Sequence, residues 1–134
     1  MSEVKIRSGT RVKLKRVDED ALNREFLIQL QELAHHSEKV EAIFFFAMQR
    51  DNAPESLCLT IAMKKRLFGD GNEEFLQFVE EVQILLPEDL PLNIYRFGTS
   101  DFLSSFCLYK IEPCHLRSRS WLEKQKKNYP PPEA

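Results

Sequence analysis

Hydrophobic and polar residues alternate near the start of the chain, between Thr10 and Val17. In an extended segment, Val12 and Leu14 share one face, and the other face carries three basic side chains: Arg11, Lys13 and Lys15. This alternation predicts a half-buried strand with a basic outer face. Apolar residues then recur at helical spacing from Leu22 to Ala34 and predict a first helix that ends at about His35 or His36.

Two apolar runs in the middle of the chain predict an antiparallel hairpin. The run from Val40 to Gln49 is rich in aromatic residues and apolar on both faces, and Leu57 to Lys64 forms the next strand after a turn. The stretch from Lys64 to Asn72 is expected to be a loop and helix cap, because it lacks the motifs of phosphate-binding and calcium-binding loops. A second helix is expected from Glu73, and Pro87 ends it.

The last third of the chain gives weaker signals. Pro91 to Phe97 is predicted to be a strand, and Ser100 to Ser105 a short helical segment. Phe106 to Ile111 is read as a fifth, edge strand. Beyond Pro113 the chain is polar and basic and ends in consecutive prolines, so we expect an appendage there.

This order of elements predicts an α/β protein of the α+β type. The pattern is a split βαββαβ fold: a two-layer sandwich in which two main helices cover one face of a mixed sheet of four to five strands. With 134 residues, the chain suits one domain, which we place at residues 9–113. Residues 1–8 are expected to be an extension, and residues 114–134 a basic C-terminal tail.

The aromatic strand raises the question of what covers the second face of the sheet. If Ile43 and Phe45 meet the helices, the opposite side chains are left without cover, and a large apolar patch is unusual on a monomer. Protein binding is one answer, a homodimer joined sheet to sheet is another, and a tail that folds back over the sheet is a third. The candidate interaction residues are Phe44, Phe46, Met48, Trp121 and Leu122.

Charge is segregated along the chain, although the net charge is only −2. The first 16 residues and the last 20 are basic, and the segment between them is strongly acidic. A candidate basic patch would join the first strand to the tail through Arg11, Lys13, Lys15, Arg117, Arg119, Lys124, Lys126 and Lys127. Nucleic-acid binding is the weaker alternative, because the predicted central strands lack base-stacking aromatic residues and the acidic segment would repel a polyanion.

Several classes of protein are not expected. The longest apolar run, Ala42 to Met48, is too short to cross a membrane, and the chain does not begin with a secretory signal. Three cysteines are too few for a disulfide framework, so we expect a reducing cytoplasm.

Metal binding and catalysis find little support in the sequence. His35 and His36 are adjacent and point about 100° apart on a helix, and Cys114 with His115 completes no closed set of ligands. A thiol nucleophile would need a base and an orienting group beside it. We therefore expect a protein without metal, cofactor or catalytic residues. A small thiol-dependent enzyme is kept as a second alternative.

Four motifs resemble the C-terminal domain of the bacterial SseB family, which is named for enhanced serine sensitivity. They are Gly9–Leu14, Asp18–Asp20, Val40–Phe46 and Glu88–Ile94, and the similarity covers about Gly9 to Tyr109. The resemblance implies a cytoplasmic bacterial α/β domain of accessory or regulatory type, with no catalytic residue to carry over. We therefore predict a non-enzymatic protein-binding or regulatory module that has a protein partner or forms a homodimer.

Overall fold

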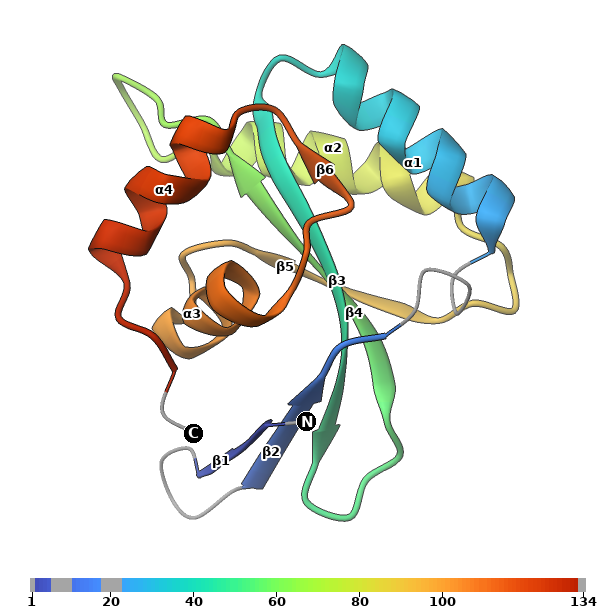
Figure 1. Cartoon of the computed structure of the whole chain (residues 1–134). Helices are drawn as coiled ribbons and strands as arrows, with labels where there is room; N and C mark the ends of the chain where they lie inside the picture. Colours follow the sequence, from blue (N-terminus) through green and yellow to red (C-terminus); the bar gives the residue numbers. More distant parts are fainter. Residues whose placement is uncertain (1, 6–10, 18–22, 133–134) are drawn as a thin grey trace.

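A mixed sheet lies at the centre of the computed structural model, which describes residues 2–5, 11–17 and 23–132 (Figure 1). Within these residues the strand order is β1–β2–β3–β4–β5, and the short β6 also pairs with β3. All paired strands are antiparallel except β4 and β5, which are parallel. The strands are β1 (Ser2–Lys5), β2 (Arg11–Lys15), β3 (Val40–Arg50), β4 (Ser56–Met63), β5 (Leu92–Arg96) and β6 (His115–Leu116). The predicted mixed sheet is confirmed.

The long hairpin of β3 and β4 organises the sheet. Its register runs from Val40 opposite Met63 to Met48 opposite Ser56, as the two apolar runs predicted. Two strands share the other edge of β3: β2 pairs with its last residues, and β6 pairs with Ala42 and Ile43. The C-terminal segment is therefore joined to the central strand.

Four helices are formed by the described residues: α1 (Arg24–His36), α2 (Asn72–Leu85), α3 (Asp101–Lys110) and α4 (Arg119–Asn128). Asn23 caps α1 by accepting a hydrogen bond from the amide of Phe26 at 3.1 Å. Gly71 precedes α2 with a φ of 74°, a conformation that favours glycine. The predicted first and second helices are confirmed.

One face of the sheet packs against α1 and α2. The side chains of Ile43, Phe45, Leu59 and Ile61 are buried there among apolar residues of the two helices, such as Phe26. Successive strand residues point to opposite faces, so Phe44, Phe46 and Met48 of β3 face away from these helices. The prediction of two main helices on one face is confirmed.

Helices α3 and α4 cover the opposite face, so the protein has three layers where two were predicted (Figure 1). The predicted edge strand from Phe106 to Ile111 is wrong, because these residues form the second half of α3 and its C-cap. Phe106, Cys107 and Leu108 are consecutive and all buried, and such a short apolar run does not distinguish a strand from a buried helix. Helical geometry lets this segment cover the aromatic face of β3.

The predicted appendage is part of this third layer. Leu122 of α4 is buried against the sheet, and the ring of Trp121 lies 5.4 Å from that of Phe97. The expectation that an exposed surface joins these residues to the aromatic strand is wrong, since Phe44, Phe46 and Met48 are buried within the monomer. The tail folds back and covers the face, as the third alternative proposed. No helix among the described residues combines the length and the apolar character needed to span a bilayer.

Candidate functional site

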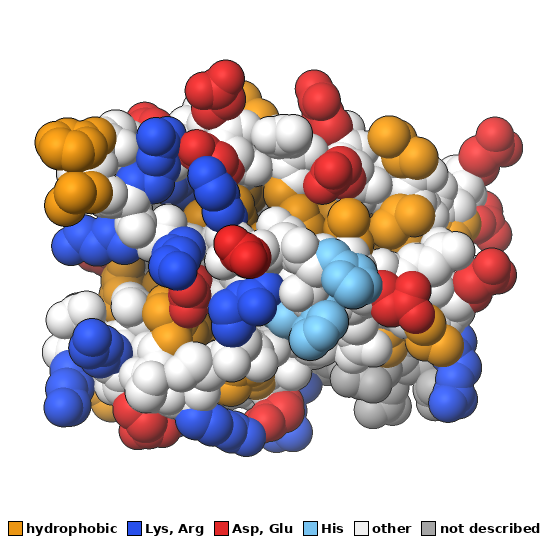
Figure 2. Space-filling view, turned by 90° about the horizontal axis from the view of Figure 1, so that it is seen from above, with side chains coloured by type: hydrophobic (Ala, Val, Ile, Leu, Met, Phe, Trp, Pro, Cys, Tyr) orange, Lys and Arg blue, Asp and Glu red, His pale blue; other side chains and the backbone are white. Residues whose placement is uncertain are grey.

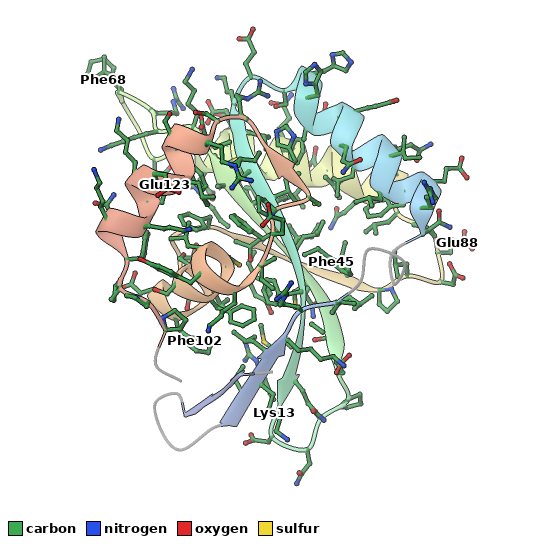
Figure 3. All side chains as sticks on the ribbon, in the orientation of Figure 1. Lys13, Phe45, Phe68, Glu88, Phe102 and Glu123 are labelled. Carbon is green, nitrogen blue, oxygen red and sulfur yellow. The ribbon has the colours of Figure 1, made fainter. Side chains whose placement is uncertain are left out.

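The connection between β4 and α2 exposes two large apolar side chains. Residues Lys64 to Gly71 form this connection, which we call the tip loop. Leu67 is 89% exposed and Phe68 is 77% exposed, and Figure 3 shows Phe68 pointing away from the body of the protein. Three basic residues, Lys64 to Arg66, precede them. This stretch was predicted only to be a loop and helix cap, although a basic run followed by two apolar residues before Gly69 is a signal that could have identified it.

Interactions at its base hold the tip loop in place. Arg66 forms an ion pair with Glu74 of α2, with Nη1 and Oε1 2.9 Å apart. Arg96 of β5 donates from Nη2 to the carbonyl oxygen of Asp70, and the Asp70 carboxylate accepts from the amide of Asn72 at 2.9 Å. An exposed ion pair adds little to stability, but these contacts orient the loop. Its apolar end therefore projects from a fixed base.

The charge on Glu74 is favoured by its surroundings. A hydrogen bond with its own backbone amide lowers the pKa of the carboxyl most, burial opposes this effect, and the cations of Arg66 and Lys39 lower it further. Glu74 lies in the first turn of α2, where a negative charge also suits the helix dipole. The anchor of the tip loop is therefore charged at neutral pH.

A hollow of about 680 Å³ lies beside the tip loop, between the end of β5 and α4. Three aromatic rings meet there: Phe97 contacts Trp121 and Tyr129, with ring centroids 5.4 and 5.5 Å apart. Cationic side chains outnumber carboxylates around these rings, so we call it the basic hollow. Its charged lining residues are Lys64, Lys65, Arg66, Arg96, Lys124, Glu41 and Asp70.

Two predicted site residues belong to the basic hollow. Trp121 and Lys124 are three residues apart on α4 and therefore lie on the same side of the helix. Trp121 is partly buried over the aromatic core, and Lys124 is exposed. Trp121 therefore packs against Phe97 of its own chain, and Lys124 lines the hollow beside the tip loop.

The structure does not bring the predicted basic patch together. Figure 3 shows Lys13 of β2 at the far end of the molecule from Glu123 of α4. Lys15, its neighbour on the strand, pairs with Glu55 at 2.9 Å. Arg11 begins the same strand. The eight residues do not form one continuous patch, because β2 pairs with the opposite end of β3 from the end where β6 leads into α4. Arg16, directly after β2, does line one hollow with Arg119 and Lys126 of the tail.

The basic side chains of the tail also contact different parts of the protein. The guanidinium of Arg117 binds backbone carbonyls at the end of α1. Arg119 pairs with Glu112 at 3.3 Å, and the ammonium of Lys126 lies 5.6 Å from the centroid of the Tyr109 ring. Lys127 is exposed near the end of α4. Lys124 is therefore the member of the predicted patch that lines the basic hollow.

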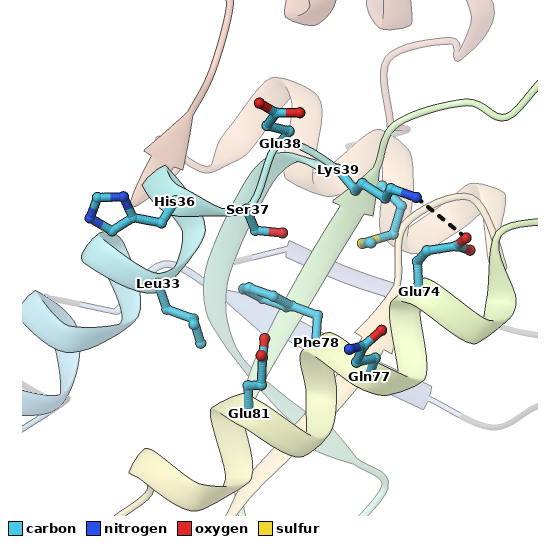
Figure 4. Close-up of a pocket in the computed structure, with 10 residues that line it drawn as sticks. Leu33, His36, Ser37, Glu38, Lys39, Glu74, Gln77, Phe78 and Glu81 are labelled. Atoms are coloured by element: carbon cyan, nitrogen blue, oxygen red, sulfur yellow. Dashed lines mark ion pairs between the residues drawn. The ribbon is translucent and has the colours of Figure 1, made fainter.

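A second hollow, of about 520 Å³, lies on the other side of the tip loop's anchor (Figure 4). It separates the end of α1, with Leu33 and His36, from the side of α2 that carries Glu74. The charge of Glu74 is balanced by Lys39 at 3.6 Å, the ion pair drawn in Figure 4. This hollow is of mixed charge, and Glu74 links it to the tip loop.

The histidines and Cys114 come together unexpectedly. Cys114 and His115 lie beside His35 and His36 around a surface hollow of about 420 Å³, because β6 packs next to α1. Within the part of the chain that the structure describes, no three metal-binding side chains form a group that could hold an ion. Burial lowers the pKa of His115 most, and the nearby charge of Arg117 lowers it further. His115 is therefore favoured in its neutral form.

Two of the three cysteines are poorly suited to act as nucleophiles. Burial raises the pKa of the Cys58 thiol to about 11 and that of the Cys107 thiol to about 12. A reactive thiol needs a lowered pKa and access to a substrate. Cys114 is only partly buried, beside His115.

Together the sheet, its four covering helices and the tip loop define a small α+β domain with an exposed apolar loop. The family model of the SseB protein C-terminal domain matches residues 6–117, so the chain belongs to this family. The match confirms the resemblance found in the sequence and extends it through β6. Comparison with curated proteins and with solved structures found no match.

Proposed function

We propose that this protein is a non-enzymatic protein-binding module that docks a partner on the tip loop and the basic hollow. The observation that carries the proposal is the exposure of Leu67 and Phe68 at the end of an anchored loop. Burial of such a side chain in an interface is worth about 1.5–3 kcal/mol. Because the loop base is already held, less conformational freedom is lost when a partner binds.

Charge defines the chemistry of the partner. Lys64 and Lys65 precede the apolar side chains of the tip loop and line the basic hollow together with Lys124, so a complementary surface would combine apolar and acidic groups. Aromatic side chains are frequent binding hot spots, which gives Phe68 the larger expected contribution. Binding through lysines at an exposed rim should weaken as salt is added.

The proposal places the protein in a reducing cytoplasm, without a catalytic role. The support is that the Cys58 and Cys107 thiols are buried and have raised pKa values. Thiol chemistry would have to use Cys114, which lies beside His115 on another side of the protein from the tip loop. Nucleic-acid binding is the weaker alternative, because Lys13 of β2 lies far from α4 (Figure 3).

The test compares capture of partners by the tagged wild-type protein and by two variants. Leu67→Ser/Phe68→Ser removes the apolar end of the tip loop, and Ile28→Ser removes a 48% exposed side chain of α1 as the matched control. We expect a partner that cross-links to Lys64 or Lys65 of the wild type and of Ile28→Ser, and that is lost from the loop variant. Equal capture by all three proteins would refute the proposal. Capture of RNA that depends on Lys64 and Lys65 would instead favour the nucleic-acid alternative.

A further inference from the structure

The exposed hydrophobic side chains are concentrated on one side of the protein. Five large ones are exposed among the described residues, and four of these belong to the tip loop and α2. Leu76 of α2 is 52% exposed and Ile84 is 82% exposed. Both lie on the outer side of the helix, away from the buried Phe78 and Val82. The tip loop and the outer side of α2 therefore carry most of the exposed large hydrophobic side chains of the described residues.

Charge divides this surface into two ends. The tip loop, which precedes α2, carries Lys64 and Lys65. Glu73 lies in the first turn of α2 beside the tip loop, Glu80 follows on the outer side of the helix, and the exposed Glu88 and Asp89 follow its C-terminal end. Figure 2 shows hydrophobic side chains next to Lys and Arg at one end, and hydrophobic side chains among Asp and Glu along its upper edge. An apolar, basic end thus adjoins an apolar, acidic one.

We infer that the partner of this surface is a second copy of the same chain. In a two-fold dimer with antiparallel α2 helices, the tip loop of each copy meets the end of α2 that carries Ile84 in the other copy. Such an interface is self-complementary, which is what a two-fold dimer requires. The helix has 14 residues and spans about 21 Å, so the two contacts form at separate places.

The charges agree with this arrangement. Lys64 and Lys65 of one copy would face the acidic end of the other, and the two-fold axis repeats this attraction. A dimer joined sheet to sheet does not fit, because helices cover both faces of the sheet. The inference rests on the proposed function, since it uses the same tip loop, and it names the second copy as the occupant.

The test is sedimentation velocity of the purified full chain, which needs no other protein. We expect a concentration-dependent dimer that weakens as salt is added. Phe68→Ser and Ile84→Ser should each weaken dimerisation about tenfold or more, because each removes an apolar side chain from both contacts. The control Ile28→Ser should dimerise as the wild type does, and circular dichroism should show that all variants are folded.

Mixing the two variants tests the geometry. A heterodimer of the Phe68→Ser and Ile84→Ser chains keeps one contact intact, whereas each homodimer has lost both, so the mixture should dimerise more tightly than either variant alone. A wild type that stays monomeric at all concentrations would overturn the inference, although loop-dependent capture of another protein could still support the proposed function. A dimer that is insensitive to Ile84→Ser, or a mixture no tighter than its components, would also overturn it.

Discussion

Arg117 donates a hydrogen bond from Nη2 to the carbonyl oxygen of Ala34, 2.9 Å away at the end of α1. The same nitrogen reaches the carbonyl of Ser37 at 2.6 Å, and Nε donates to the carbonyl of Val40 at 3.0 Å. These carbonyls lie at the negative end of the α1 dipole and in the turn to β3, where a cation is favourable. The Arg117 side chain therefore helps to hold the segment after β6 to the first half of the chain, in addition to the hydrogen bond from its own amide to the carbonyl of Glu41.

Removal of this side chain should destabilise the protein. Arg117→Met leaves several backbone carbonyls without their charged donor, so we expect the free energy of unfolding to fall by about 1–2 kcal/mol. Urea denaturation measures the change. Arg119→Met is the control, because its exposed ion pair with Glu112 should contribute less than about 0.5 kcal/mol. Equal effects of the two substitutions would show that Arg117 has no special role.

The second layer of helices makes a separate prediction. Leu122 is buried in the core that covers the aromatic face of β3, so Leu122→Ala should lower the free energy of unfolding by about 2–4 kcal/mol. Leu67→Ala makes the same chemical change at an exposed position and should alter the free energy by less than about 0.5 kcal/mol. If α4 were a loosely attached appendage, the two variants would be equally stable.

His115 should make stability depend on pH. Its pKa is lowered in the folded state by burial and by Arg117, so the unfolded chain binds the proton more readily. Stability is therefore lost as pH falls below the unfolded pKa of about 6.5, until the folded pKa is reached. His115→Gln should flatten this part of the profile when urea midpoints are measured between about pH 5 and pH 8. Parallel profiles of wild type and variant would contradict the assignment.

Thiol labelling tests how accessible and reactive each cysteine is in the folded protein. Cys58 and Cys107 should resist iodoacetamide at neutral pH in the native protein, because burial both covers them and raises their pKa values to about 11 and about 12. Cys114 is only partly buried and should be labelled first. Mass spectrometry of tryptic peptides locates the label. Rapid labelling of Cys107 in the folded protein would revive the thiol-enzyme alternative.

Much of the first layer follows from local patterns in the sequence. The strand β4 and the helices α1 and α2 are visible from their periods. The strand β3 is visible as a short apolar run rich in aromatic residues, which ends at the turn after Arg50. The segment from Phe106 to Leu108 gives no period at all, since every side chain is buried. Its helical form depends on the sheet face that it covers, which is tertiary information.

The candidate site was only partly predictable for a similar reason. The apolar surplus of Phe44, Phe46 and Met48 correctly indicated that something must cover the second face, but not that the chain's own tail does so. Pairing of β6 with β3 joins residues far apart in the sequence, and no local pattern reports it. Leucine and phenylalanine are typical core residues, so only the fold shows that Leu67 and Phe68 are exposed.

The most direct test of the proposed function is a paired measurement on Leu67→Ser/Phe68→Ser. The account predicts that this variant unfolds in urea at the same midpoint as the wild type, because both side chains are exposed. It also predicts that the variant binds the captured partner about tenfold more weakly or worse. A variant that keeps full affinity for that partner would contradict the claim that the tip loop is the binding surface.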